Sequence, residues 1–111
     1  MISPALSQDP PEEDVSTDRP KEYSFNPLQA AKEVKIGSYY FKKGSYKAAI
    51  GRFKEALKWD ANDADAWLRL GETQTKLKNP KEANEAFAKY LQLRPDGKES
   101  EIVRKRLQSK S

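Results

Sequence analysis

Residues 64–97 decide the fold, and they read ADAWLRLGETQTKLKNPKEANEAFAKYLQLRPDG. Apolar and small residues recur three or four positions apart in two runs, which is the spacing of one face of an α-helix. The first run is Trp67, Leu70 and Gly71, with the polar Gln74 at the next position of the same face, and the second is Ala83, Phe87, Tyr90 and Leu91. The stretch therefore predicts two helices with a short turn between them.

The preceding stretch, residues 30–63, repeats this pattern with a period of 34. An alignment without gaps gives seven identical pairs: Ala30/Ala64, Gly37/Gly71, Lys42/Lys76, Lys47/Lys81, Ala49/Ala83, Phe53/Phe87 and Leu57/Leu91. A fixed period of this length is typical of a helical repeat protein, in which short turns make successive helices antiparallel. We expect helices at 27–43, 46–59, 63–77 and 80–93, and a fifth at 98–109.

Local signals mark where these helices begin and end. In the first turn, Gly44 suits a left-handed C-terminal cap and Ser45 an N-cap. In the second turn, Asn79 is the expected N-cap, Pro80 the first helical residue and Glu82 the capping-box partner.

The first helix has a similar start signal. Asn26 is its expected N-cap, Pro27 its first residue and Gln29 its capping-box partner. Phe25 is placed to form a hydrophobic staple toward Ala30.

These residues resemble the signature of the tetratricopeptide repeat family, which is W-x2-L-G-x2-Y, then A-x3-F, then P. The second unit matches with Trp67, Leu70, Gly71, Ala83, Phe87 and Pro95, and it departs only at Gln74, where Tyr is expected. The first unit matches with Gly37, Tyr40, Ala49 and Phe53, and it has Ile36 for Leu, Glu33 for Trp and Ala61 for Pro. The resemblance implies an all-α fold, a right-handed superhelix of about five helices.

The small and large residues of the signature also have a physical role. Small residues such as Gly37 and Gly71 let two helix backbones approach, and large residues such as Phe53 and Phe87 fill the space beside them. Glu33 replaces Trp on a helix with no preceding repeat, so we interpret it as an edge residue. The fifth helix carries an apolar stripe that we expect to seal the last open face of the solenoid; its members are Ile102, Val103 and Leu107.

The charge changes sign along the chain. Residues 1–27 hold five of the seven prolines and six acids against two bases, a net charge of −4, whereas residues 28–111 hold 19 bases and 11 acids, a net charge of +8. Many prolines and few apolar residues predict a disordered arm. We therefore expect an acidic, proline-rich arm at 1–25, repeats at 26–63 and 64–97, and a capping helix at 98–111.

Composition excludes most other functions. The 111 residues contain no Cys and no His, which removes disulfides, thiolate zinc sites and His-assisted nucleophiles. The glycines form no phosphate-binding loop, and we expect no catalytic residue, cofactor or metal site.

No apolar run is long enough to span a membrane, so we expect a soluble chain. Basic clusters such as residues 104–106 are short and interrupted by acids, and a solvated helix face accounts for them better than nucleic-acid binding does.

The resemblance implies a groove, lined by the first helix of each repeat, that binds a peptide or helix of another protein. Carried over position by position, the groove residues are Val34, Lys35, Ser38, Phe41 and Lys42, then Asp65, Leu68, Arg69, Glu72, Thr75 and Lys76, with Arg106 on the fifth helix. Bases outnumber acids in this set, so we expect a basic groove with apolar spots at Val34, Phe41 and Leu68, and an acidic partner. The alternative is that these charges only form a solvated face.

Three further expectations concern partners and setting. Two repeats plus a cap are few, which predicts marginal stability or weak self-association. The acidic arm is either a weak internal competitor for the groove or a plain linker. An alternative function is a bacterial envelope component resembling repeat-containing lipoproteins that help to assemble outer-membrane proteins, because the arm would suit a tether.

Overall fold

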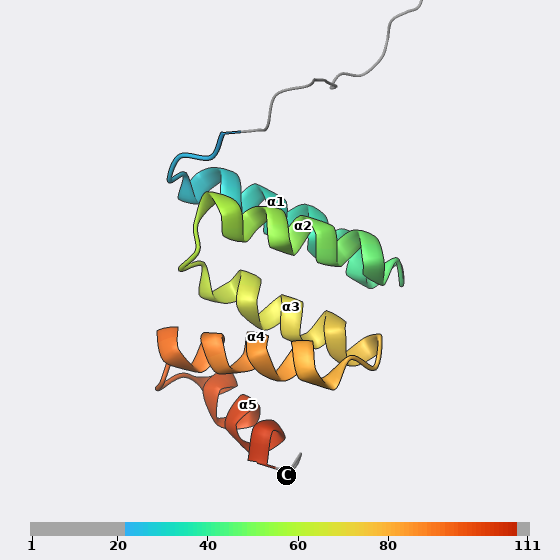
Figure 1. The fold of residues 1–111 in the computed structure, drawn as a ribbon, viewed down its shortest axis with the longest axis vertical. Helices are drawn as coiled ribbons and strands as arrows, with labels where there is room; N and C mark the ends of the chain where they lie inside the picture. Colours follow the sequence, from blue (N-terminus) through green and yellow to red (C-terminus); the bar gives the residue numbers. More distant parts are fainter. Residues whose placement is uncertain (1–21, 109–111) are drawn as a thin grey trace, which may run out of the picture.

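The computed structural model describes residues 22–108, and these residues form five helices stacked in chain order (Figure 1). The helices are α1 (Pro27–Lys42), α2 (Tyr46–Trp59), α3 (Ala64–Lys76), α4 (Pro80–Leu93) and α5 (Lys98–Gln108). No strand occurs in the described part of the chain. The predicted all-α solenoid is confirmed, and each helix boundary lies within one residue of its predicted position.

The period of the sequence holds in three dimensions. α4 begins and ends exactly one period after α2, and α3 ends one period after α1. α5 begins one period after α3. It therefore takes the place of the first helix of a third repeat.

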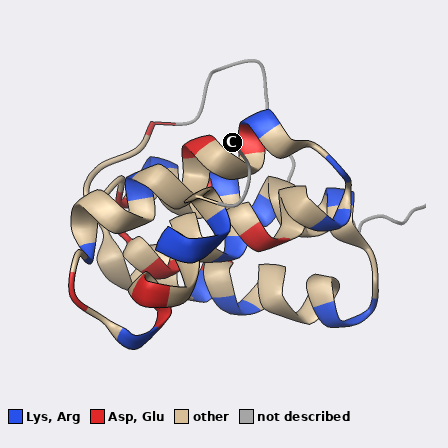
Figure 2. Ribbon diagram, turned by 90° about the horizontal axis from the view of Figure 1, so that it is seen from below, with Lys and Arg blue, Asp and Glu red and all other residues tan. Residues whose placement is uncertain are grey.

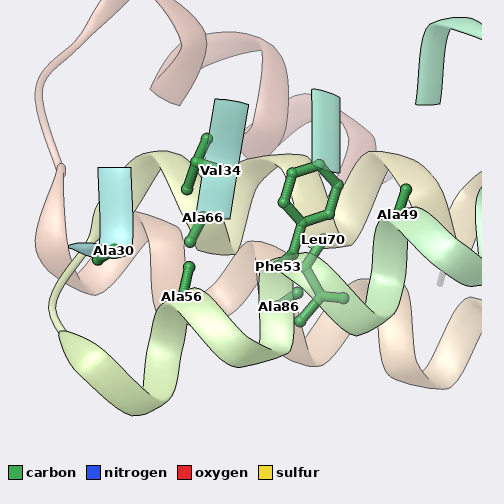
Figure 3. Packing of buried hydrophobic residues seen from close by; sticks show 8 residues of the cluster. All are labelled: Ala30, Val34, Ala49, Phe53, Ala56, Ala66, Leu70 and Ala86. Carbon is green, nitrogen blue, oxygen red and sulfur yellow. The ribbon is translucent and has the colours of Figure 1, made fainter. Parts of the chain in front are cut away.

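Two hydrophobic clusters form the core, one for each repeat. The first joins α1 and α2 to α3 around the buried ring of Phe53 (Figure 3). The second joins α3 and α4 to α5 around Phe87, with Val103 of α5 buried against it. Each new helix thus covers the apolar side of the pair before it.

The α1–α2 and α3–α4 turns, one in each repeat, share backbone hydrogen bonds at equivalent positions, although their sequences differ. Gly44 (φ +82°) donates its N–H to the carbonyl of Phe41, and Lys78 (φ +61°) donates to the carbonyl of Thr75. The predicted left-handed cap at Gly44 is confirmed. Lys78 adopts the same left-handed conformation without being a glycine, which is strained for a residue with a Cβ.

Not all predicted caps form. The Oδ1 of Asn26 accepts the N–H of Gln29 at 3.0 Å as expected, but the Gln29 side chain donates to Glu33 and completes no capping box. Phe25 is exposed and forms no staple. Ser45 and Asn79 occupy the N-cap positions without side-chain cap bonds.

The departure from the family signature at Gln74 explains the missing cap at Asn79. The Asn79 side-chain amide donates to the Oε1 of Gln74 at 2.9 Å, so it is not turned toward its own helix. Gln74 is buried, and this bond supplies the polar partner that its side chain needs.

Glu33 lines the open outer side of the first helix pair, but its side chain is not exposed as that of an edge residue would be. Its side chain is buried, pairs with Arg52 of α2 at 3.0 Å and accepts a bond from Gln29 at 3.2 Å. A charged residue replaces Trp here because a basic residue of the neighbouring helix compensates its charge.

Positions 1–21 of the predicted arm lie outside the described residues. Its last part was assigned wrongly, because the segment directly before α1 packs on the solenoid. The ring of Tyr23 lies edge-on to Trp59 with 4.8 Å between centroids, and its hydroxyl donates to Glu55 at 2.8 Å. The N–H of Asn26 donates to the Trp59 carbonyl at 3.0 Å, so this segment anchors the entry to α1.

α5 seals the second core with fewer residues than expected. Val103 is buried and Leu107 is half-buried, but Ile102 is 62% exposed and lies outside the seal. Ser100 is buried instead, and its hydroxyl donates to the carbonyl of Arg94. None of the described helices is long and apolar enough to cross a membrane.

Candidate peptide-binding groove

Three hollows follow one another along the side of α3 that faces α5, and together we name them the α3–α5 groove. The first, of about 300 Å³, lies beside Asp65, and the second, of about 80 Å³, shares Leu68 and Glu72 with it. The third and largest, of about 450 Å³, lies beside Thr75 and shares Arg106 with the second. The groove thus runs from the start of α3 to its end.

The largest hollow of the α3–α5 groove has an apolar floor and a polar rim. Its lining residues come from the end of α3, the α3–α4 turn, α4 and α5: Thr75, Lys78, Asn79, Pro80, Ala83, Asn84, Phe87 and Arg106. The guanidinium of Arg106 lies over the Phe87 ring, 5.2 Å from its centroid. A cation over an aromatic face is attracted by the ring quadrupole, so Arg106 is held at the mouth of the hollow. The hollow can take an apolar side chain beside an acidic group.

The opposite end of the groove is less basic than predicted. Arg69 pairs with Asp65 at 3.5 Å and with Glu72 at 3.3 Å, so acids of its own helix balance its charge. Glu99 of α5 lines the same end. Figure 2 shows basic and acidic segments interspersed on the helices in this view. The basic character of the groove is therefore concentrated at the Thr75 end, with Lys76, Lys78 and Arg106.

The structure corrects two of the predicted apolar spots. Val34 is only 7% exposed and Leu68 only 6%, because each packs in a hydrophobic cluster. Leu68 still forms part of the groove wall, but Val34 lines none of the three hollows. Position matching alone could not show this burial, since the family pattern fixes the helix face and not the neighbouring side chains.

The other predicted α1 residues do not join the groove. Lys35 and Lys42 are exposed and Ser38 is half-buried, but none of them lines a hollow beside α3. Phe41 is half-buried, with its ring edge-on to Tyr46 at 5.3 Å between centroids. The structure therefore brings together Leu68, Arg69, Glu72, Thr75 and Arg106, with Asp65 and exposed Lys76 at the two ends of α3.

Sequence reasoning missed several groove residues. Ile102 and Glu99 of α5 line the groove, and Asn79 contributes from the turn. Ile102 and Glu99 stand one period after Leu68 and Asp65, so extending the repeat register into α5 would have found both. Asn79 has no such signal, because its side chain is placed by its bond to Gln74.

The groove offers contacts for binding. The described residues contain no group of three or more acidic side chains arranged to hold a metal ion. The side chains present supply apolar contact, charge and hydrogen bonds, which is what recognition of a peptide requires.

Comparison with known proteins identifies the family of this fold. The family model described as tetratricopeptide repeat matches residues 40–105, and the chain belongs to that family of protein-interaction modules, which are generally not enzymes. A search of curated proteins found no match.

Among solved structures, the crystal structure of MamA is similar with a TM-score of 0.60 and 26% sequence identity. The similarity covers 63% of this chain and 41% of the MamA chain, so this chain spans less than half the length of that structure. The first repeat domain of Spaghetti (RPAP3), bound to the HSP90 peptide SRMEEVD, matches with a TM-score of 0.38 and 19% identity, covering 77% of this chain and 95% of the other.

Proposed function

We propose that this protein binds an extended acidic segment of another protein along the α3–α5 groove. The observation that carries the proposal is the hollow of about 450 Å³, whose floor at Phe87 is apolar and whose rim holds Lys78 and Arg106. An apolar side chain of the partner enters this hollow, and neighbouring carboxylates face the basic rim. A buried anchor supplies most of the binding free energy, and complementary charge speeds association and selects the partner.

The charge distribution gives the bound segment a direction. At the start of α3, Arg69 is already paired with Asp65 and Glu72, so a carboxylate there would compete with two acids of the protein. At the end of α3, Lys76 is exposed and directly follows Thr75, which lines the large hollow. The acidic part of the partner therefore lies at the Thr75 end. We propose that Lys35 and Lys42 of α1 add to its attraction at longer range.

Selection from a peptide display library tests the proposal. We expect the wild type to enrich peptides with several Asp or Glu residues beside one large apolar residue. A variant with Lys76→Glu and Arg106→Glu should bind the selected peptide at least about tenfold more weakly, because two attractive charges become repulsive.

The matched control carries Lys47→Glu and Lys105→Glu, which make the same change in net charge at exposed positions outside the groove. It should bind within about twofold of the wild type. Equal weakening by both variants would assign the effect to net charge alone, and enrichment of basic peptides would contradict the proposal.

Three sequence-based expectations stay predictions: weak self-association, competition by the acidic arm for the groove, and the envelope alternative. The arm is the cheapest to test, because deletion of residues 1–21 leaves the Tyr23 anchor in place. If the arm competes, the deletion raises affinity for the selected peptide. Unchanged affinity would leave it as a linker.

A further inference from the structure

The outer face of α1 is uncovered, whereas the same face of α3 is buried. Ala66 and Leu70 of α3 are packed in the first core cluster with residues of α2. Ile36, which stands one period before Leu70, is 37% exposed, and Tyr39 is 57% exposed. Among residues 22–108, nothing covers α1 as α2 covers α3. Leu28, near the start of α1, is 79% exposed.

A hollow of about 460 Å³ lies beside this face, between α1 and α2. Its lining residues are Glu33, Tyr40, Ala48, Gly51, Arg52 and Glu55. The second repeat has an equivalent hollow, and five of its lining residues stand one period after residues of the first hollow: Trp67, Gln74, Glu82, Glu85 and Ala86. Lys54 and Leu57 of α2 also line this second hollow. In the second repeat, α2 therefore lies beside the hollow. On the outer side of α1 and α2, no helix of residues 22–108 lies at the corresponding place.

Gly51 is the one glycine inside a helix with no packing reason in the described structure. A Cβ on Gly37 or Gly71 would collide with a Phe ring, but a Cβ on Gly51 would meet nothing within 4 Å. A glycine in a helix interior costs about 1 kcal/mol relative to alanine. Nothing in the described part of this chain approaches Gly51 closely enough to need a glycine there. The backbone of another molecule that packs closely on α2 would need one.

The charges around the face are suited to an acidic occupant. The exposed charged residues of α1 and its C-cap are all basic: Lys32, Lys35, Lys42 and Lys43. The only acid of α1, Glu33, is buried and paired with Arg52. Glu55 of α2 accepts the hydroxyl of Tyr23.

Two occupants from this protein itself fit less well. A second copy would place the α1 lysines against each other, which is unfavourable. Residues 1–21 hold five acids but also four prolines, a composition unsuited to a helix.

We propose that the outer face of α1 and α2 docks an amphipathic helix of another protein, at a site separate from the α3–α5 groove. The apolar stripe of that helix packs on Ile36 and Tyr39, and its backbone approaches α2 at Gly51. Acidic residues on its flanks face Lys32 and Lys43. The docked helix lies on the side of α1 that corresponds to the α2 side of α3, and it approaches Gly51 more closely than α2 approaches Glu85, the residue one period later.

Two designed helical peptides test this site directly. Both have the same leucine stripe, and one has glutamate on its flanks where the other has lysine. We expect the glutamate peptide to bind the wild type at least about tenfold more tightly in fluorescence polarisation. Equal binding of the two peptides, or no binding of the glutamate peptide, would overturn the proposal.

The diagnostic variant is Gly51→Gln, which puts a helix-forming side chain into the hollow. We expect it to fold with a melting temperature no lower than that of the wild type and to bind the glutamate peptide at least about tenfold more weakly. Ala88→Gln adds the same side chain at an exposed position of α4 and should leave binding unchanged. Ile36→Gln is the second variant, and it should weaken binding without changing the helix.

Other occupants would give different results. A wild type that sediments as a dimer, with a monomeric Gly51→Gln variant, would assign the face to a second copy. Binding of the glutamate peptide that appears only after deletion of residues 1–21 would assign it to that segment. Either result would overturn the proposal.

Discussion

The ring of Phe87 occupies the space in which a side chain of residue 71 would begin. A Cβ on Gly71 would lie 2.6 Å from Cδ1 and Cε1 of Phe87, and a Cβ on Gly37 would lie 2.6 Å from Cε1 of Phe53. The relationship recurs from one repeat to the next, so each repeat uses one small and one large residue to bring its two helices together. The floor of the proposed binding hollow therefore depends on a glycine of α3.

Gly71→Ala should destabilise the protein by about 1–3 kcal/mol, because the added methyl group overpacks the core and displaces the Phe87 ring. The gain in helix propensity of about 1 kcal/mol offsets only part of this cost. Urea unfolding measures the difference. Gly51→Ala is the matched control and should stabilise the protein by up to about 1 kcal/mol, since nothing lies within 4 Å of its Cβ. Stabilisation by both substitutions would contradict the packing argument.

Lys78→Gly should stabilise the protein by up to about 1 kcal/mol, because Lys78 has a positive φ that glycine adopts without strain. Gly44→Ala, at the equivalent turn, should destabilise it by about 1 kcal/mol for the same reason. Thermal unfolding of both variants checks the pair. A loss of stability in Lys78→Gly would mean that contacts of the lysine side chain outweigh its backbone strain.

Arg52→Ala should destabilise the protein by about 1–3 kcal/mol, because it leaves the buried carboxylate of Glu33 with the bond from Gln29 but without its charged partner. The double variant Glu33→Gln with Arg52→Ala should recover part of the loss, since a neutral amide costs less to bury. Chemical denaturation of both variants measures the recovery. No difference between the single and double variants would contradict the argument, because it would show that the carboxylate without Arg52 costs no more to bury than a neutral amide.

Asp63 predicts a pH dependence. Its pKa is raised above the ordinary value of 3.8, chiefly because burial disfavours the charged carboxylate; the N–H of Ala66 opposes this shift, and Asp65 and Asp60 add to it. Asp63 therefore holds its proton more tightly in the folded state than in the unfolded state. The stability that this tighter proton binding contributes is fully present below the ordinary pKa of 3.8, and it is lost as the pH rises through the pKa of the folded state. Asn at this position keeps an acceptor for the helix cap without the charge.

The stability of Asp63→Asn relative to the wild type should accordingly increase as the pH rises above the ordinary pKa of 3.8 and then become constant. Urea unfolding across this range provides the measurement. A stability difference that does not change with pH, or that decreases as the pH rises, would contradict the assignment.

Much of the fold could be predicted because the deciding interactions are local or recur with the period. Helix boundaries follow from apolar spacing and from Pro27 and Pro80, and Gly44 marks a turn that needs a left-handed residue. Lys78 shows the limit: the second turn keeps the same conformation without a glycine, because the helices on both sides impose it.

The site was predicted less completely, because exposure depends on side chains from other helices. Val34 stands at a groove position of its helix, yet the packing of α2 and α3 around it closes it off. Arg69 contributes less free charge than its position suggested, because two acids of the same helix pair with it. Tyr23 was assigned to the arm, since no local pattern indicates its contact with Trp59, which is the last residue of α2.

The most direct test of the proposed function is a ¹H–¹⁵N NMR titration of the wild type with the acidic peptide selected on it. We predict that the largest shifts occur at Thr75, Asn79 and Arg106 around the large hollow. Shifts that are concentrated on α1, or spread evenly over the lysines of the whole surface, would contradict binding in the α3–α5 groove.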